Sequence, residues 1–132
     1  MDYLLDTHVL LWTLVSKKKL SKAVKNILLN PESNIFISTI SLWEISLKFQ
    51  LGKLKLRGKL PHEIPDIVTN LGFNFLILDP IASSNFYKLP KFRNKDPFDR
   101  MLAWQAISED FTLISKDKGF DSYQKAGLKR VW

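Results

Sequence analysis

The sequence predicts an α/β fold in which helices cover both faces of a central, mainly parallel sheet. Short apolar runs alternate along the chain with segments of helical pattern. Because the runs are continuously apolar, we expect their strands to be buried on both faces, as in a parallel sheet. With 132 residues and 45% hydrophobic content, the chain is sized for one domain, residues 1–132.

The first half of the chain contains two strand candidates. The run YLL at 3–5 ends at Asp6, and the apolar residues of NIFIS predict a strand at 34–38. Helical patterns predict helices at 21–29 and 41–50. The glycine-containing LGKLKLRGKL at 51–60 indicates a connecting loop or a short hairpin, although its alternating Lys and Leu could instead cover an apolar surface.

Prolines mark the helix starts of the second half. Pro61, Pro80 and Pro97 each stand where a first helical residue needs no amide partner. The helices that they begin are predicted at 61–71, 80–88 and 97–108. The apolar runs between and after them predict strands at 75–78, 111–115 and 128–131.

Composition limits the chemistry and suggests the partner. There are no cysteines, so a disulfide framework and a thiolate metal site are excluded, and a bound metal must use oxygen or imidazole ligands. The net charge of +7, with Lys and Arg in short groups, favours a polyanionic partner or a merely solubilising surface. The first residues resemble neither a secretory signal nor a membrane span, so we expect a cytoplasmic protein without a membrane partner.

Acids placed just after apolar runs are the candidates for a site, because ligands of open α/β sheets bind beyond the carboxyl ends of the strands. Asp6, Asp79 and Asp117 follow such runs, and Glu44 and Asp99 are expected in the first turns of helices. An acid that ends an apolar strand is costly unless it reaches water, a partner or a metal, which favours a role for Asp6.

Each of the other acids also has a purely structural explanation. Ser41 and Glu44 have the spacing of a capping box, and Asp96 before Pro97 has the form of a helix N-cap. Asp79 before Pro80 has the same form and is assigned a structural role, and Asp117 could begin a turn.

If Asp6, Glu44, Asp99 and Asp117 converge, their mutual repulsion requires a cation. Mg²⁺ or Mn²⁺ would bind such oxygens together with substrate phosphate, which favours phosphodiester chemistry.

Four motifs in this order resemble the PIN-domain ribonuclease family, and more narrowly the VapC-type toxins of toxin–antitoxin pairs. They are LLDTHVLLW (4–12), ISTISLWEISLK (37–48), DPFDRMLAWQA (96–106) and LISKDKGF (113–120). The resemblance implies a three-layer α/β/α sandwich, hydrolysis of RNA phosphodiester bonds with Mg²⁺ or Mn²⁺, a cognate antitoxin and a homodimer.

The resemblance also assigns the site. Asp6, Glu44, Asp99 and Asp117 match the family's four acids and are expected to bind metal and carry the catalysis. The family commonly has His where this chain has Asn94, which puts a proton-transfer or RNA-contact role there in doubt, and it commonly has Thr at the position of Ser115.

Further residues are expected around these acids in supporting roles. Asp96 is expected to cap its helix first and to be an auxiliary ligand second, and Thr7 could orient Asp6 through its hydroxyl or amide. His8 is expected to be a hydrogen-bonded structural group rather than a ligand. Lys48 and Arg100 are candidates to hold a substrate phosphate, or else each forms a local ion pair.

Two other classes of protein fit the sequence less well. A receiver-type signalling domain would have acid pairs after the first strand, and an aspartyl-nucleophile phosphatase would have Asp where His8 stands. A catalytically inactive PIN-like module that binds RNA or protein is the main alternative. The sequence does not name the RNA target or the antitoxin.

Overall fold

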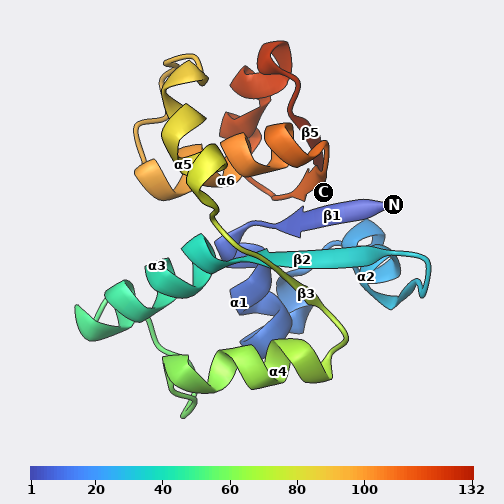
Figure 1. The fold of residues 1–132 in the computed structure, drawn as a ribbon. Helices are drawn as coiled ribbons and strands as arrows, with labels where there is room; N and C mark the ends of the chain where they lie inside the picture. Colours follow the sequence, from blue (N-terminus) through green and yellow to red (C-terminus); the bar gives the residue numbers. More distant parts are fainter.

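A central sheet of five strands lies between two layers of helices in the computed structural model, which describes residues 1–132 (Figure 1). The strands are β1 (Asp2–Leu5), β2 (Asn34–Ser38), β3 (Asn74–Leu76), β4 (Thr112–Ile114) and β5 (Lys129–Val131). Their order across the sheet is β3-β2-β1-β4-β5, and every neighbouring pair is parallel. The predicted α/β/α sandwich with a mainly parallel sheet is therefore confirmed.

The helices pack on both faces of this sheet, with residues of α1, α2 and α4 in one core and residues of α6 in the other (Figure 1). The α-helices are α1 (Thr7–Val15), α2 (Lys22–Leu29), α3 (Thr39–Gln50), α4 (Ile64–Asn70), α5 (Pro80–Asn85) and α6 (Pro97–Glu109). The 3₁₀ segments are η1 (Lys17–Lys19), η2 (Pro61–Glu63), η3 (Phe86–Lys88) and η4 (Lys118–Ala126). None of the helices is both long and apolar enough to span a bilayer.

Successive residues of the central strands enter two different hydrophobic cores. Leu5 and Ile114 belong to the core on one face, whereas their neighbours Leu4 and Leu113 belong to the core on the other face. All four side chains are completely buried. This burial on both faces explains why the strands read as continuous apolar runs.

The structure differs from the predicted elements in several places, among them η4, where no helix was predicted. Helix α1, which starts directly after Asp6, was not predicted. Helix α3 starts at Thr39 and is capped by the Ser38 hydroxyl, which accepts a hydrogen bond from the amide of Ile40 (3.0 Å). Ser41 is therefore not an N-cap. Residues 51–60 form no strand, so the hairpin alternative was wrong and the connecting loop was right.

Candidate functional site

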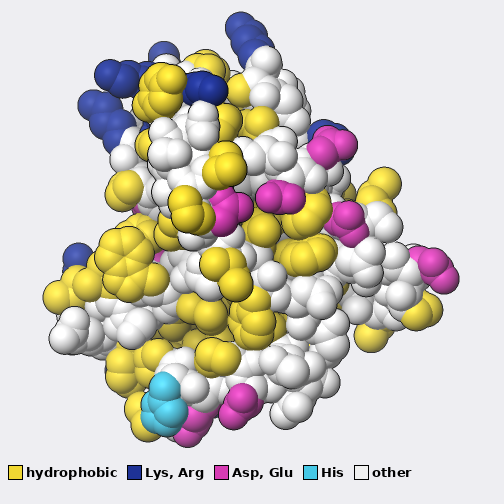
Figure 2. Space-filling model, viewed as in Figure 1, with side chains coloured by type: hydrophobic (Ala, Val, Ile, Leu, Met, Phe, Trp, Pro, Cys, Tyr) yellow, Lys and Arg dark blue, Asp and Glu magenta, His cyan; other side chains and the backbone are white.

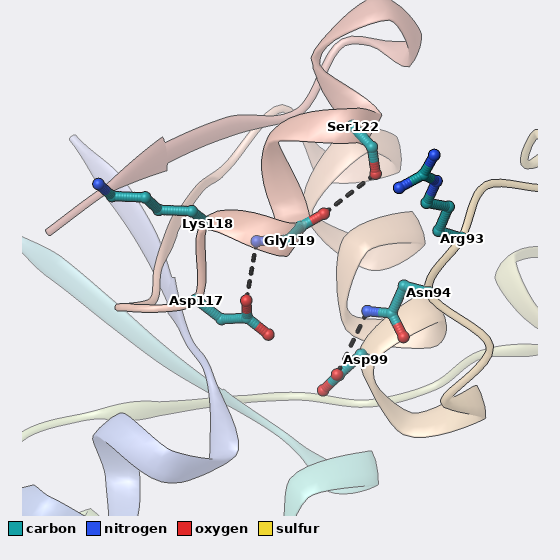
Figure 3. A pocket seen from close by; sticks show the side chains of 7 residues that line it. All are labelled: Arg93, Asn94, Asp99, Asp117, Lys118, Gly119 and Ser122. Carbon is teal, nitrogen blue, oxygen red and sulfur yellow. Dashed lines mark hydrogen bonds between the residues drawn. The ribbon is translucent and has the colours of Figure 1, made fainter.

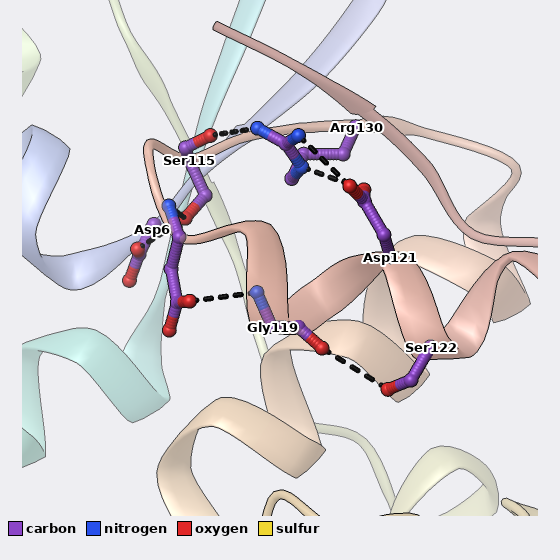
Figure 4. A network of polar contacts seen from close by, with 7 residues as sticks. Asp6, Ser115, Gly119, Asp121, Ser122 and Arg130 are labelled. Atoms are coloured by element: carbon purple, nitrogen blue, oxygen red, sulfur yellow. Dashed lines mark hydrogen bonds and ion pairs between the residues drawn. The ribbon is translucent and has the colours of Figure 1, made fainter.

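The register of β1 against β4 brings the first predicted acid to a hydroxyl group. Leu5 pairs with Ile114, so the residues that follow them, Asp6 and Ser115, lie side by side at the carboxyl edge of the sheet. The Ser115 hydroxyl donates a 2.7 Å hydrogen bond to Asp6 Oδ2 (Figure 4). Asp6 is only 4% exposed, and its other oxygen, Oδ1, is buried without a partner.

Glu44 is a second buried carboxylate with an unpaired oxygen. It lies in the second turn of α3 rather than the first, because the helix starts earlier than predicted. Glu44 is 3% exposed, and its Oε2 accepts a hydrogen bond from the Lys48 ammonium one turn later. Its Oε1 has no hydrogen-bond partner.

Asp99 lies in the first turn of α6, held by the residues before it. As predicted, Asp96 is the N-cap, and its Oδ1 accepts hydrogen bonds from the amides of Phe98 (2.8 Å) and Asp99 (3.3 Å). Asn94 donates from Nδ2 to Asp99 Oδ2 (3.3 Å) and accepts at Oδ1 from the Asp96 amide (3.0 Å). The asparagine therefore links the two acids.

Asp117 is the N-cap of η4, in agreement with the alternative that this residue begins a turn. Its Oδ1 accepts a hydrogen bond from the amide of Gly119 (2.8 Å), and its own amide donates to Ser115 Oγ (3.0 Å). A Cβ atom on Gly119 would lie 2.9 Å from that Oδ1, so a larger residue there would make the Asp117 carboxylate shift. Ser115 thus connects Asp117 to Asp6 through one hydroxyl group.

The acids are close enough to perturb one another's ionisation. Burial, followed by the charges of Asp6 and Asp96, raises the pKa of Asp99 to about 7. Burial also raises the pKa of Asp6, to which the Glu44 carboxylate adds, although the Ser115 hydrogen bond acts in the opposite direction. Partial burial lowers the pKa of Lys48, but its hydrogen bond with Glu44 and the charges of Asp96 and Asp99 raise it overall. Asp6, Glu44 and Asp99 therefore form one electrostatic cluster.

Two hollows open on this cluster. Asp99 and Asp117 face each other across a hollow of about 480 Å³ without hydrophobic lining (Figure 3). Its other lining residues are Arg93, Asn94, Lys118, Gly119 and Ser122. A second hollow of about 280 Å³ is lined by Glu44, Thr7, His8 and Lys48, among others.

No group of three acidic or histidine side chains is close enough, as positioned, to hold a metal ion between them. Asp117 and Glu44 are each engaged within the chain, by the Gly119 amide and the Lys48 ammonium. Two buried carboxylate oxygens have no hydrogen-bond partner and so are available to a cation: Asp6 Oδ1 and Glu44 Oε1.

Several residues lie differently from the expectation. The Thr7 hydroxyl bonds to the Ser41 hydroxyl (2.8 Å) and not to Asp6, so only its amide is left to act on that carboxylate. The His8 side chain is exposed and makes no hydrogen bond, so the prediction of a structural hydrogen bond for it was wrong. The Arg100 guanidinium bonds to Pro90 O (3.3 Å) and the Tyr123 hydroxyl (3.2 Å), which makes it a local structural group without an ion pair.

One supporting residue was not found from the sequence. Arg130, assigned there only to a basic group, binds both carboxylate oxygens of Asp121 (2.8 and 3.1 Å) and the carbonyl oxygen of Ser115 (2.9 Å) (Figure 4). This hydrogen bonding lowers the pKa of Asp121. Arg130 therefore holds the backbone that carries Ser115, and the sequence offered no signal for a contact made across η4 and β5.

Comparisons with known proteins agree with this arrangement. The family model described as the PIN domain matches residues 3–126. None of the curated proteins is a sequence match.

Among solved structures, VapBC2 from Rickettsia felis bound to a promoter DNA fragment is 20% identical, with a TM-score of 0.67 over 99% of this chain and 98% of that one. DNA-bound VapBC from Salmonella typhimurium is 20% identical, with a TM-score of 0.65 over 99% and 97%. VapBC-1 from nontypeable Haemophilus influenzae is 19% identical, with a TM-score of 0.63 over 99% and 97%. Because these identities are about 20%, the structural matches establish a similarity of fold only.

Proposed function

Because the chain belongs to the PIN domain family, we propose that it is a metal-dependent ribonuclease that hydrolyses RNA phosphodiester bonds. The observation that carries the proposal is the pair of buried oxygens without partners, Asp6 Oδ1 and Glu44 Oε1. An unsatisfied buried acceptor typically costs about 1–3 kcal/mol, and a charged one more. Two of them in one acidic cluster fit a cation that binds there in the working protein.

The residues present fit a hard divalent cation. Asp6, Glu44, Asp99 and Asp117 offer only carboxylate oxygens, and oxygen ligands are those that Mg²⁺ and Mn²⁺ prefer. Burial and then the repulsion of neighbouring acids raise the pKa of Asp99 to about 7, and a bound divalent cation would offset this repulsion. Such an ion would polarise a phosphoryl oxygen and make water a better nucleophile at neutral pH.

The chain's own residues would orient these ligands and handle the proton. Ser115 fixes one oxygen of Asp6 and so directs the other toward the cluster. Asn94 does the same for one oxygen of Asp99. Asp117 is exposed and lines the larger hollow, whereas Glu44 is buried and paired with Lys48, so Asp117 is the better placed to accept a proton from water.

The similarity to VapBC structures supports a second part of the proposal, that the chain is the toxin of a toxin–antitoxin pair and binds a protein antitoxin. Large apolar side chains stay exposed on the segment around α5, which suits a protein contact: Ile77 is 69%, Ile81 74% and Tyr87 79% exposed. A homodimer is part of the same proposal.

The test is cleavage of structured and single-stranded RNAs by the purified protein, with Mg²⁺ or Mn²⁺ compared with EDTA. Asp6→Asn and Asp99→Asn would be assayed beside the wild type, and circular dichroism would show that they fold. We expect metal-dependent cleavage that both substitutions abolish. RNA binding without cleavage under every condition would favour the inactive binding module instead, and unchanged cleavage by Asp6→Asn would refute the metal site.

A further inference from the structure

The loop between η3 and α6 has an alternating pattern of charge and burial. Lys91, Arg93 and Lys95 are exposed, whereas the residues between and after them, Phe92, Asn94 and Asp96, are partly buried. The chain bends at Arg93 and forms no strand over these residues. The three exposed cations lie on the outside of the loop, and we call them the basic row (Lys91, Arg93 and Lys95).

The inward side chains of this loop fix it to the fold. Leu89, just before it, is 3% exposed. Phe92 packs edge-on against Tyr123, with ring centroids 5.0 Å apart. Asn94 bonds to the Asp99 carboxylate and to the Asp96 amide. The basic row is thus held in place by contacts that also position an acid of the candidate site.

The basic row lies beside the acids and has no carboxylate partner within the chain. Arg93 lines the same 480 Å³ hollow as Asp99 and Asp117, and its side chain rises along the wall opposite Asp117 (Figure 3). The salt bridges of the chain use Lys48, Lys129 and Arg130, so all three cations of the row are free. Lys and Arg side chains also gather toward the upper end of the face shown in Figure 2.

We propose that the basic row binds successive phosphates of a single-stranded RNA segment whose adjoining phosphodiester lies at the acidic hollow. The inference rests on the proposed function, because it takes RNA as the substrate. Three free cations on one short loop can each neutralise a phosphate of the same strand. A single strand can follow such a row and still lower one phosphodiester to recessed acids, and it can do so without base recognition.

This assignment replaces the substrate-phosphate residues expected from the sequence. Lys48 is bound to Glu44, and the Arg100 guanidinium is occupied by Pro90 and Tyr123. The amides of Gly119 and Phe120 in η4 are not free for a phosphate either, because both donate to Asp117. Arg93, which is in no salt bridge, lines the larger hollow together with Asp99 and Asp117.

The experiment measures binding of a fluorescent single-stranded RNA by anisotropy at several salt concentrations, with EDTA present so that no cleavage occurs. The test protein carries Lys91→Gln, Arg93→Gln and Lys95→Gln together. The matched control carries Lys17→Gln, Lys18→Gln and Lys19→Gln, which removes the same charge from η1, beyond the far end of the helix that starts after Asp6. Thermal melts of both proteins would show that the fold is intact.

We expect the test protein to bind RNA at least about tenfold more weakly than the wild type, with the slope of log K against log salt reduced by about 2. The control should keep most of the wild-type slope. With Mg²⁺, the test protein should show a raised KM and a largely retained kcat. Equal losses in both proteins, or no loss in either, would overturn the proposal.

Cleavage assays with Mg²⁺ separate this inference from the nuclease proposal. If the wild-type protein cuts no RNA but the slope of log K against log salt still falls only in the test protein, the nuclease proposal is refuted and the basic row remains an RNA-binding site. Cleavage by the test protein with an unchanged KM would refute the row and keep the nuclease.

Discussion

The hydroxyl group of Ser115 donates to Asp6 Oδ2 across 109 residues of sequence, and it is the only hydrogen bond that a side chain makes to that carboxylate. The same oxygen of Ser115 accepts the amide hydrogen of Asp117. One buried hydroxyl group therefore sets the positions of two of the four acids relative to each other.

Replacing Ser115 with Ala is expected to destabilise the metal-free protein by about 1–3 kcal/mol, because a second buried oxygen of Asp6 then loses its partner. Urea denaturation with EDTA measures the change. Ser115→Thr keeps the hydroxyl group and is the control, with a smaller expected effect. Equal destabilisation by Ala and Thr would mean that the volume of the side chain matters at this position and its hydrogen bond does not.

Replacing Asp99 with Asn should abolish cleavage and yet stabilise the metal-free protein at pH 8. Since the pKa of Asp99 is raised to about 7 in the folded chain, folding favours the protonated form, and stability is lost as the pH rises from about 4 through 7. Asn cannot ionise and escapes this loss. After allowance for solvent screening at this half-buried site, we expect a gain of about 1 kcal/mol at pH 8. Denaturation at pH 8 and pH 5 tests this, and a gain as large at pH 5 would contradict it.

Replacing Asn94 with Ala is expected to weaken Mg²⁺ binding about tenfold, because Asp99 loses the donor that orients it and favours its ionised form. Asn94→Asp should bind Mg²⁺ more tightly than Asn94→Ala, because the added carboxylate increases the repulsion that a divalent cation offsets. Titration calorimetry of the two variants measures both effects. Wild-type affinity in Asn94→Ala would show that Asp99 is held by the helix alone.

Replacing Lys48 with Met is expected to destabilise the metal-free protein by about 1–2 kcal/mol, because Glu44 is left buried with no partner for either oxygen. The double variant Glu44→Gln with Lys48→Met should recover most of this loss. Added Mg²⁺ should stabilise Lys48→Met more than the wild type, as judged by the shift in Tm. A Lys48→Met protein as stable as the wild type in EDTA would indicate that water already reaches Glu44.

The strands and the first acid were predictable because burial leaves a direct mark on the sequence. Residues that face two cores are apolar at every position, and Asp6 interrupts such a run. Helix α1 was missed for the same reason. Its sequence THVLLWTLV is apolar on nearly every side, so it has no helical periodicity to distinguish it from a strand.

The supporting contacts of the site could not be predicted, because they depend on tertiary packing. Asn94 looked like the loss of a functional histidine, and only the fold of the loop shows that it bonds to Asp99. Arg100 looked like a free cation near the acids, but its partners Pro90 and Tyr123 come from separate parts of the chain. Spacing along the sequence carries no information about such partners.

The passage from β1 to α1 through Asp6 alone sets a limit on how this chain can change in length. One residue inserted there would turn α1 by about 100° relative to the strand and would carry Asp6 away from Ser115. Residues 30–33, which join α2 to β2 at the opposite edge of the sheet, have no such restriction. Insertions and deletions among relatives should therefore accumulate at the amino edge of the sheet, while the β1–α1 junction keeps a constant length even where its flanking apolar residues have been exchanged.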